Sequence, residues 1–233
     1  MKDQAVLPWL VHALTASGAF LAYLALVAIV AGDLRAAFLW LTLTTVIDAV
    51  DGMLARLARV KERASLLDGA RLDGIVDYLT FVFVPAFAIQ HVGLLPAGAI
   101  EWLVVAAILL SSAFGFSRQD AKTADHFFMG FPSYWNIVAV YLVALQWPGA
   151  VNAVILLICA AGVFVPVGYI YPSRTVTLRR LTVVAGIVWG VALVAIIWQL
   201  PTPPRWLVLT SLLYPVYYFA LSFVLALQRR LRL

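Results

Sequence analysis

The chain has little that would cross-link a small secreted domain or bind a metal through sulfur. Its 233 residues include one cysteine, Cys159, which sits within an apolar run. A single cysteine excludes an internal disulfide framework and a thiolate metal site. We therefore interpret Cys159 as a small packing residue.

Charged residues are also scarce. Only 12% of the residues are charged, whereas 64% are hydrophobic, and the mean hydropathy is +1.00. This composition excludes an ordinary soluble domain and indicates an integral membrane protein. The net charge of +5 does not indicate nucleic-acid binding, because the basic residues lie at the ends of apolar segments. The N-terminus has no short apolar core followed by a cleavage site, so we expect no signal peptide.

Eight apolar segments are long enough, at about 20 residues each, to cross a bilayer. They cover residues 12–31, 36–57, 68–90, 98–117, 132–148, 150–171, 178–199 and 204–227. The fifth is the shortest and ends at Trp147-Pro148. All connections are short and no internal repeat is visible. We therefore expect an all-α polytopic membrane protein with about eight transmembrane helices, forming a single integral membrane domain over residues 1–233.

The distribution of basic residues predicts the orientation of these segments, because cytoplasmic loops carry an excess of Lys and Arg. The termini and the connections after segments two, four and six are basic, whereas the other connections carry only Arg35 and Arg205. The residues on the basic side are Lys2, Arg59, Lys61, Arg63, Arg118, Lys122, Arg174, Arg179, Arg180, Arg229, Arg230 and Arg232. Both termini are therefore predicted to be cytoplasmic.

Against this apolar background, five aspartates lie between residues 48 and 77. They are Asp48, Asp51, Asp68, Asp73 and Asp77. A charged side chain at the centre of a membrane helix costs about 2.5 to 3.5 kcal/mol. Several carboxylates in one short stretch therefore require compensation, for which bound cations are the obvious candidate.

The spacing of these aspartates supports a cation site. Asp48 and Asp51 share one helix face, while Gly69, Asp73 and Asp77 recur every four residues and share another. Two such helices facing each other would bring four carboxylates to one small volume. Oxygen ligands suit Mg²⁺ or Mn²⁺, and two such ions about 3.5–4 Å apart are a common device for phosphoryl chemistry.

Asp68 lies off the face that carries Asp73 and Asp77. We predict that it caps the start of its helix, with Arg71 as its partner.

The pattern Asp-x-x-Asp-Gly-x-x-Ala-Arg, followed by Gly-x-x-x-Asp-x-x-x-Asp, resembles the signature of the CDP-alcohol phosphotransferases. Its positions are filled by Asp48, Asp51, Gly52, Ala55, Arg56, Gly69, Asp73 and Asp77. Twelve residues separate the two halves, about one helical turn more than in most of the family. This longer gap, together with residues 11–18 and 131–136, resembles the bacterial phosphatidylcholine synthase branch.

The resemblance implies a CDP-alcohol phosphotransferase-like bundle with motif helices over 36–57 and 68–90, in a family that is often homodimeric. It implies transfer of a phosphatidyl group from CDP-diacylglycerol to an alcohol at the cytoplasmic face of a bacterial inner membrane. Two ions, Mn²⁺ or Mg²⁺, would be held by Asp48, Asp51, Asp73 and Asp77, and Asp77 would also be the general base. Residues implied to contact CDP-diacylglycerol are Thr15, Gly52, Ala55, Arg56, Arg63, Ser65 and Gly69. The acyl chains would stay in lipid beside the motif helices.

Choline is the favoured acceptor, because aromatic residues gather on the cytoplasmic side and cation–π contact is the usual way to hold a quaternary ammonium. The candidate choline-binding residues are Tyr78, Tyr134, Trp135, Asn136 and Tyr169. An interfacial aromatic belt would explain the same residues. Serine or glycerol 3-phosphate stays as an alternative acceptor.

A function from another class is an ion-coupled transporter, which also places carboxylates in a membrane. Such folds usually show inverted repeats and broken helices near the bilayer midplane, which this sequence does not show.

Overall fold

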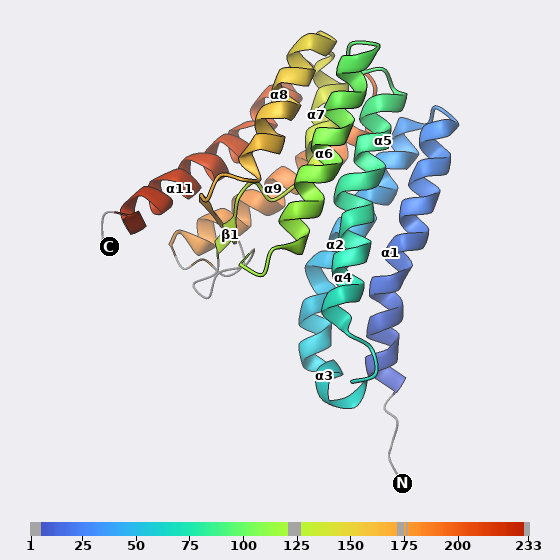
Figure 1. Ribbon diagram of the computed structural model, residues 1–233, viewed down its shortest axis with the longest axis vertical. Coiled ribbons are helices and arrows are strands. Elements are labelled where there is room, and N and C mark those ends of the chain that lie inside the picture. The colour runs from blue at the N-terminus through green and yellow to red at the C-terminus, as the bar shows by residue number, and fades with distance from the viewer. Residues whose placement is uncertain (1–5, 121–126, 172–174, 176, 231–233) are drawn as a thin grey trace.

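The computed structural model describes residues 6–120, 127–171, 175 and 177–230. Of the basic residues that predict the topology, Lys2, Lys122, Arg174 and Arg232 lie outside the described residues. Most of the described chain is helical (Figure 1), which confirms the predicted all-α class.

The first half of the chain forms α1 (Val6–Val30), α2 (Leu34–Leu57), α3 (Val60–Arg63), α4 (Gly69–Asp77), the π-helix η1 (Tyr78–Phe83), α5 (Val84–His91) and α6 (Ala99–Ser117). The second half forms β1 (Phe127–Met129), α7 (Trp135–Leu145), α8 (Gly149–Gly162), β2 (Gly168–Ile170), α9 (Arg179–Trp198), α10 (Arg205–Ser211) and α11 (Leu213–Arg230). The two short strands pair antiparallel, with Phe127 opposite Ile170.

Six helical segments within the described residues are long and apolar enough to cross a membrane. They are Val6–Val30, Leu34–Leu57, Gly69–His91, Ala99–Ser117, Arg179–Trp198 and Arg205–Arg229. Their outward faces are apolar: on α9, Val184, Ile187 and Val191 are all exposed. Helices of this length and surface are stable in lipid, where their backbone groups are satisfied internally. The chain is therefore a multi-pass membrane protein.

The segments predicted over 132–148 and 150–171 form shorter helices than expected. α7 has 11 residues and α8 has 14, below the roughly 17 residues that a spanning helix needs. The backbone just before α7 pairs with the backbone at and just after the end of α8 instead of continuing the helices. Gly130 N donates to Val167 O at 2.9 Å, and Phe131 N donates to Gly162 O at 3.0 Å.

The segment predicted over 68–90 is one continuous helical stretch whose winding changes directly after Asp77. There α4 passes into η1, and η1 passes into α5. A π-helix has wider turns, with hydrogen bonds five residues apart, and occurs frequently at functional sites. The change of winding lies beside the two aspartates of the second motif half.

The motif helices pack against α1, as Figure 1 shows on its lower right side, with α3 near their tip. Small residues allow this approach, because Ala22 and Ala25 of α1 are buried. At Gly18 an added Cβ would lie 2.6 Å from Val76 Cγ1. The absence of a side chain at Gly18 therefore lets α1 and α4 come close, as is common between membrane helices.

Candidate metal and substrate site

The start of α4 fixes the direction of the second motif half. The Asp68 side chain accepts hydrogen bonds from Ala70 N at 3.1 Å and Arg71 N at 3.2 Å. Arg71 Nε lies 3.0 Å from the other carboxylate oxygen. This confirms the predicted cap and its partner. Because the cap sets where the helix begins, it also sets which face carries Asp73 and Asp77.

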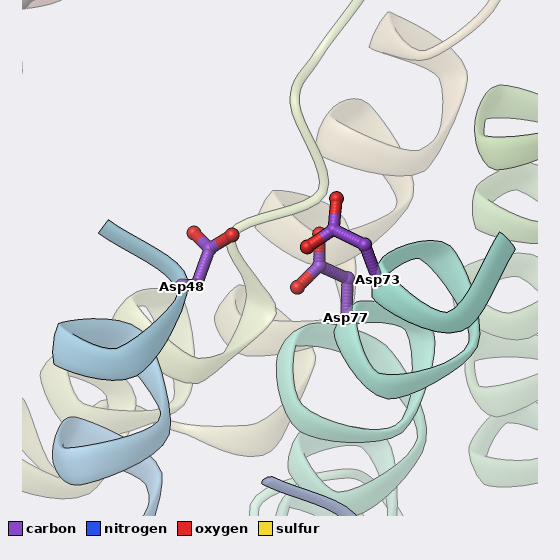
Figure 2. Close-up of side chains that lie close together, drawn as sticks. All are labelled: Asp48, Asp73 and Asp77. Carbon is purple, nitrogen blue, oxygen red and sulfur yellow. The ribbon is translucent and has the colours of Figure 1, made fainter. Parts of the chain in front are cut away.

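The structure brings together three of the four predicted metal ligands. Asp48 of α2 and Asp73 and Asp77 of α4 each offer one carboxylate oxygen, and these three atoms lie within 4.8 Å of one another. Figure 2 shows the three side chains converging from the two helices. All three residues are half-buried. We call these residues the carboxylate cluster.

The carboxylate cluster fits a divalent cation by the chemistry of its donors. Mg²⁺ and Mn²⁺ prefer carboxylate oxygens. Two oxygens on opposite sides of one Mg²⁺ are about 4 Å apart, since each lies about 2.1 Å from the ion. The spacing of the three oxygens, within 4.8 Å of one another, is therefore close to that of ligands around one ion.

Asp51, the fourth predicted ligand, faces α1. Thr15 Oγ1 donates a hydrogen bond of 2.7 Å to Asp51 Oδ2, and both residues are buried. The hydroxyl of Thr15, which the sequence assigns to CDP-diacylglycerol, is therefore bound to a motif carboxylate in this structure.

The predicted nucleotide-binding residues fall into two groups. Gly52, Arg56, Arg63 and Ser65 are exposed, and a Cβ at Gly52 would make only an ordinary contact of 3.6 Å with Arg56 Nη1. No neighbour in the described part of the chain therefore requires a glycine at position 52. Gly52 is therefore accessible from outside the described chain, and its contact with CDP-diacylglycerol stays a prediction.

Gly69 and Ala55 are half-buried. At Gly69 an added Cβ would lie 3.0 Å from His12 Cε1, so this glycine makes room for the buried His12 ring of α1. The burial of His12 between α1 and α4 is a contact that the sequence did not predict. Its Nε2 is buried without a hydrogen-bond partner among the described residues.

The five candidate choline-binding residues are placed in different environments. Only Tyr134 lines the cavity described below. Its ring meets Phe81 edge to face at 5.9 Å, and Asp48 of the carboxylate cluster lines the same cavity. Tyr134 is therefore the candidate that lies beside the carboxylate cluster.

The other four candidates make contacts within the protein. Tyr78 donates its hydroxyl to Leu109 O at 2.9 Å. Trp135 is fully buried and donates its indole N–H to Ser112 Oγ at 2.7 Å. Asn136 donates to Thr45 Oγ1 at 3.1 Å. Tyr169 is buried and stacks on Tyr218, with ring centroids 6.3 Å apart.

An apolar cavity of 460 Å³ begins at the carboxylate cluster. Its wall includes Asp48 of α2. It follows α7 from Tyr134 to Leu145 and reaches Trp147, just after that helix. Further parts of the wall come from η1, the segment before α7, α8, α9 and the α10–α11 joint with the start of α11, and they include Cys159. Nothing in the sequence indicates that these segments line a common space.

Hydrogen bonds fix the aromatic wall of this cavity. Trp189 Nε1 donates to the Tyr141 hydroxyl at 2.9 Å, and that hydroxyl is hydrogen-bonded to Ser211 Oγ at 2.9 Å. Tyr214 stacks on Trp189 with centroids 5.0 Å apart. In the sequence these hydroxyl and indole groups lie in three separate apolar segments. Only the fold shows that they are hydrogen-bonded to one another.

Comparison with known proteins agrees with the motif. No family model matches the chain. The phosphatidylcholine synthase of Legionella pneumophila is 39% identical over 222 residues, which cover 92% of this chain and 87% of that protein. That of Pseudomonas aeruginosa is 41% identical over 193 residues, covering 83% and 81%. That of Rhizobium meliloti is 34% identical over 224 residues, covering 95% and 91%. With such similarity over most of its length, the chain belongs to the phosphatidylcholine synthase family.

Proposed function

We propose that this protein transfers a phosphatidyl group from CDP-diacylglycerol to choline, giving phosphatidylcholine and CMP. The observation that carries the proposal is the position of Asp48, which belongs both to the carboxylate cluster and to the wall of the apolar cavity. One place thus offers oxygen ligands for a cation beside space for a lipid. The alternative of an ion-coupled transporter loses support, because the similar proteins are synthases.

Divalent cations, Mn²⁺ or Mg²⁺, would be held by Asp48, Asp73 and Asp77, with Asp51 as a further ligand. When bound, such ions neutralise the diphosphate and stabilise the charge that develops on the leaving phosphate. Arg56, exposed one turn beyond Gly52, supplies a guanidinium for the same phosphates. Two ions and four carboxylate ligands remain the arrangement that the motif favours.

The Asp77 carboxylate is proposed as the general base. It takes the proton of the choline hydroxyl as the choline oxygen forms a bond to the phosphatidyl phosphorus. The bond from this phosphorus to the bridging oxygen breaks, and CMP leaves with that oxygen. The proton stays on Asp77 until it passes to solvent. A direct attack of this kind needs no covalent enzyme intermediate.

Tyr134 is the best-placed residue for the choline cation. Its ring is packed against Phe81, and it lines the same cavity as Asp48 of the carboxylate cluster. An aromatic face beside carboxylates attracts a quaternary ammonium through cation–π and charge interactions. The other four predicted residues make the protein contacts described above, so we assign them structural roles and no direct contact with choline.

We infer that the cavity takes one acyl chain of the lipid substrate, which revises the expectation that both chains stay in bulk lipid. One water molecule takes up roughly 30 Å³ in the liquid, and a methylene group is of similar size. The cavity volume of 460 Å³ therefore corresponds to about fifteen methylene groups, the length of one acyl chain. α7, which it follows, is about 16 Å long, close to the roughly 15 Å of one bilayer leaflet. Choline is too small to fill this space and would occupy only its polar end, where Tyr134 and Asp48 lie.

The single cysteine tests this placement. Cys159 lines the cavity, so a lipophilic maleimide should label it in the purified protein. CDP-diacylglycerol with long chains should slow the labelling, whereas CDP alone should not. Equal protection by both would place the acyl chains elsewhere.

The reaction is proposed to take place at the cytoplasmic face of a bacterial inner membrane, with both termini in the cytoplasm. The described basic residues that precede α3 and begin α9, such as Arg59 and Arg179, support this orientation. Labelling of single cysteines introduced at the two ends of the chain, from either side of sealed vesicles, tests it.

The deciding experiment uses the purified full chain in mixed micelles with CDP-diacylglycerol, Mn²⁺ and labelled choline. Label should enter phosphatidylcholine, and Asp77→Asn should abolish this. Product with serine or glycerol 3-phosphate, but not with choline, would keep the chemistry and replace the acceptor. No product with any of these alcohols, from folded protein that binds Mn²⁺, would overturn the enzymatic function.

A further inference from the structure

The hydrogen bond between Thr15 and Asp51 joins α1 to the first motif half. At 2.7 Å it is short, and it lies in the interior: Thr15 is 8% exposed and Asp51 is 6% exposed. The other contact of the Thr15 hydroxyl, to Val11 O, is long at 3.4 Å. The hydroxyl hydrogen is therefore directed to the carboxylate.

A buried carboxylate needs hydrogen-bond partners, and a hydrogen bond to an ionised acceptor is roughly twice as strong as a neutral one. Thr15 occupies Oδ2 of Asp51. The other oxygen, Oδ1, accepts no hydrogen bond from the part of the chain that the structure describes. The carboxylate is thus held by one oxygen, while the second remains available.

Asp51 follows Asp48 by three residues, so the two lie on neighbouring positions of one face of α2. Asp48 is part of the carboxylate cluster. A rotation that kept Oδ2 on Thr15 would change only the direction of Oδ1. In metal sites, carboxylate ligands are commonly oriented by hydrogen bonds from residues that do not touch the metal.

We propose that Thr15 is a positioning residue for the metal site: its hydroxyl holds Asp51 so that Oδ1 can join the carboxylate cluster as a fourth ligand. The inference rests on the metal site of the proposed function. It gives Thr15 a role through Asp51 in place of the direct contact with CDP-diacylglycerol that the motif resemblance implies.

The test measures Mn²⁺ binding to the purified full chain by electron paramagnetic resonance, in which free Mn²⁺ gives the signal. Removing an orienting partner typically weakens metal affinity about 10- to 100-fold. Thr15→Val should therefore raise the Kd for Mn²⁺ by this factor, and Thr15→Ser should bind nearly as the wild type does. Thr15→Ala is measured as well, so that the result does not depend on one side-chain shape. Ser17→Ala is the matched control, because the Ser17 hydroxyl of the same helix donates to Leu14 O.

A double-mutant cycle separates positioning from general destabilisation. In an Asp51→Asn background, Thr15→Val should cause no further loss of Mn²⁺ affinity, because the carboxylate it orients is gone. An undiminished loss in that background, or wild-type affinity in Thr15→Val, would overturn the role of Thr15. If the wild type binds Mn²⁺ no better than Asp73→Asn does, the proposed metal site is wrong, and the role of Thr15 inferred from it is wrong as well.

Discussion

Substitution of Gly18 by alanine tests whether the close approach of α1 and α4 sets the position of the proposed base. The added Cβ would lie 2.6 Å from Val76 Cγ1, whereas carbon atoms in contact prefer about 3.5–4.0 Å. The helices must therefore separate by roughly 1 Å, since a valine in a helix has essentially one rotamer available. Val76 directly precedes Asp77, so the displacement reaches the site.

The expected cost has two parts. Overpacking of this kind destabilises by about 1–3 kcal/mol, which outweighs the gain of up to about 1 kcal/mol from replacing glycine in a helix. A displacement of about 1 Å at a catalytic group lowers the rate by about 100-fold. Gly18→Ala should therefore lower the melting temperature in detergent and reduce kcat for phosphatidylcholine formation more than it raises KM.

Two further variants make the test specific. Val76→Ala removes the methyl group that clashes, so the double variant should recover most of the lost kcat. Gly190→Ala on α9 is the control, because an added Cβ there meets nothing within 4 Å. The reasoning fails if Gly18→Ala matches Gly190→Ala in both stability and kcat, or if Val76→Ala brings no recovery.

Three other predictions follow from individual contacts. Ser112→Ala leaves the buried Trp135 N–H without its acceptor, which should lower the free energy of unfolding by about 1–3 kcal/mol while the KM for choline stays constant. Gly130→Ala should reduce the yield of folded protein in detergent, because Gly130 has φ +86 and an added Cβ would collide with Val163 O; normal yield and melting temperature would contradict this. Removal of divalent ions with EDTA should abolish activity, and added Mn²⁺ should restore it in the wild type but not in Asp73→Asn.

The sequence predicted the parts of this protein that depend on local pattern. Apolar length identified the long helices, and the spacing of Asp73 and Asp77 placed them on one face of α4. The Asp68 cap and its ion pair with Arg71 were also predictable, because both partners lie within three residues. These features require only the periodicity of a helix and the chemistry of its ends.

What the sequence did not predict depends on contacts between distant segments. Thr15 and Asp51 are 36 residues apart, and nothing in either segment shows that their side chains meet. The cavity needs the α10–α11 joint beside α7 and α2, which hydropathy does not reveal. The shortness of α7 and α8 has the same origin, because the backbone of Gly130 and Phe131 pairs with residues more than 30 positions later.

The π-helix after Asp77 also lies between two helix faces with different roles, the face of α4 that carries the aspartates and the face of α5 that packs in the core. Ahead of it, α4 must aim its carboxylates at α2; after it, α5 must keep Val84, Ala86 and Ile89 in the core. Each residue turns an α-helix by about 100°, so loss of one residue within η1 would rotate one surface against the other by about that angle. The six residues of η1 therefore set the rotation of the aspartate face of α4 relative to the core-facing side of α5. An insertion or deletion within η1 would redirect Asp73 and Asp77 without changing any residue of either face.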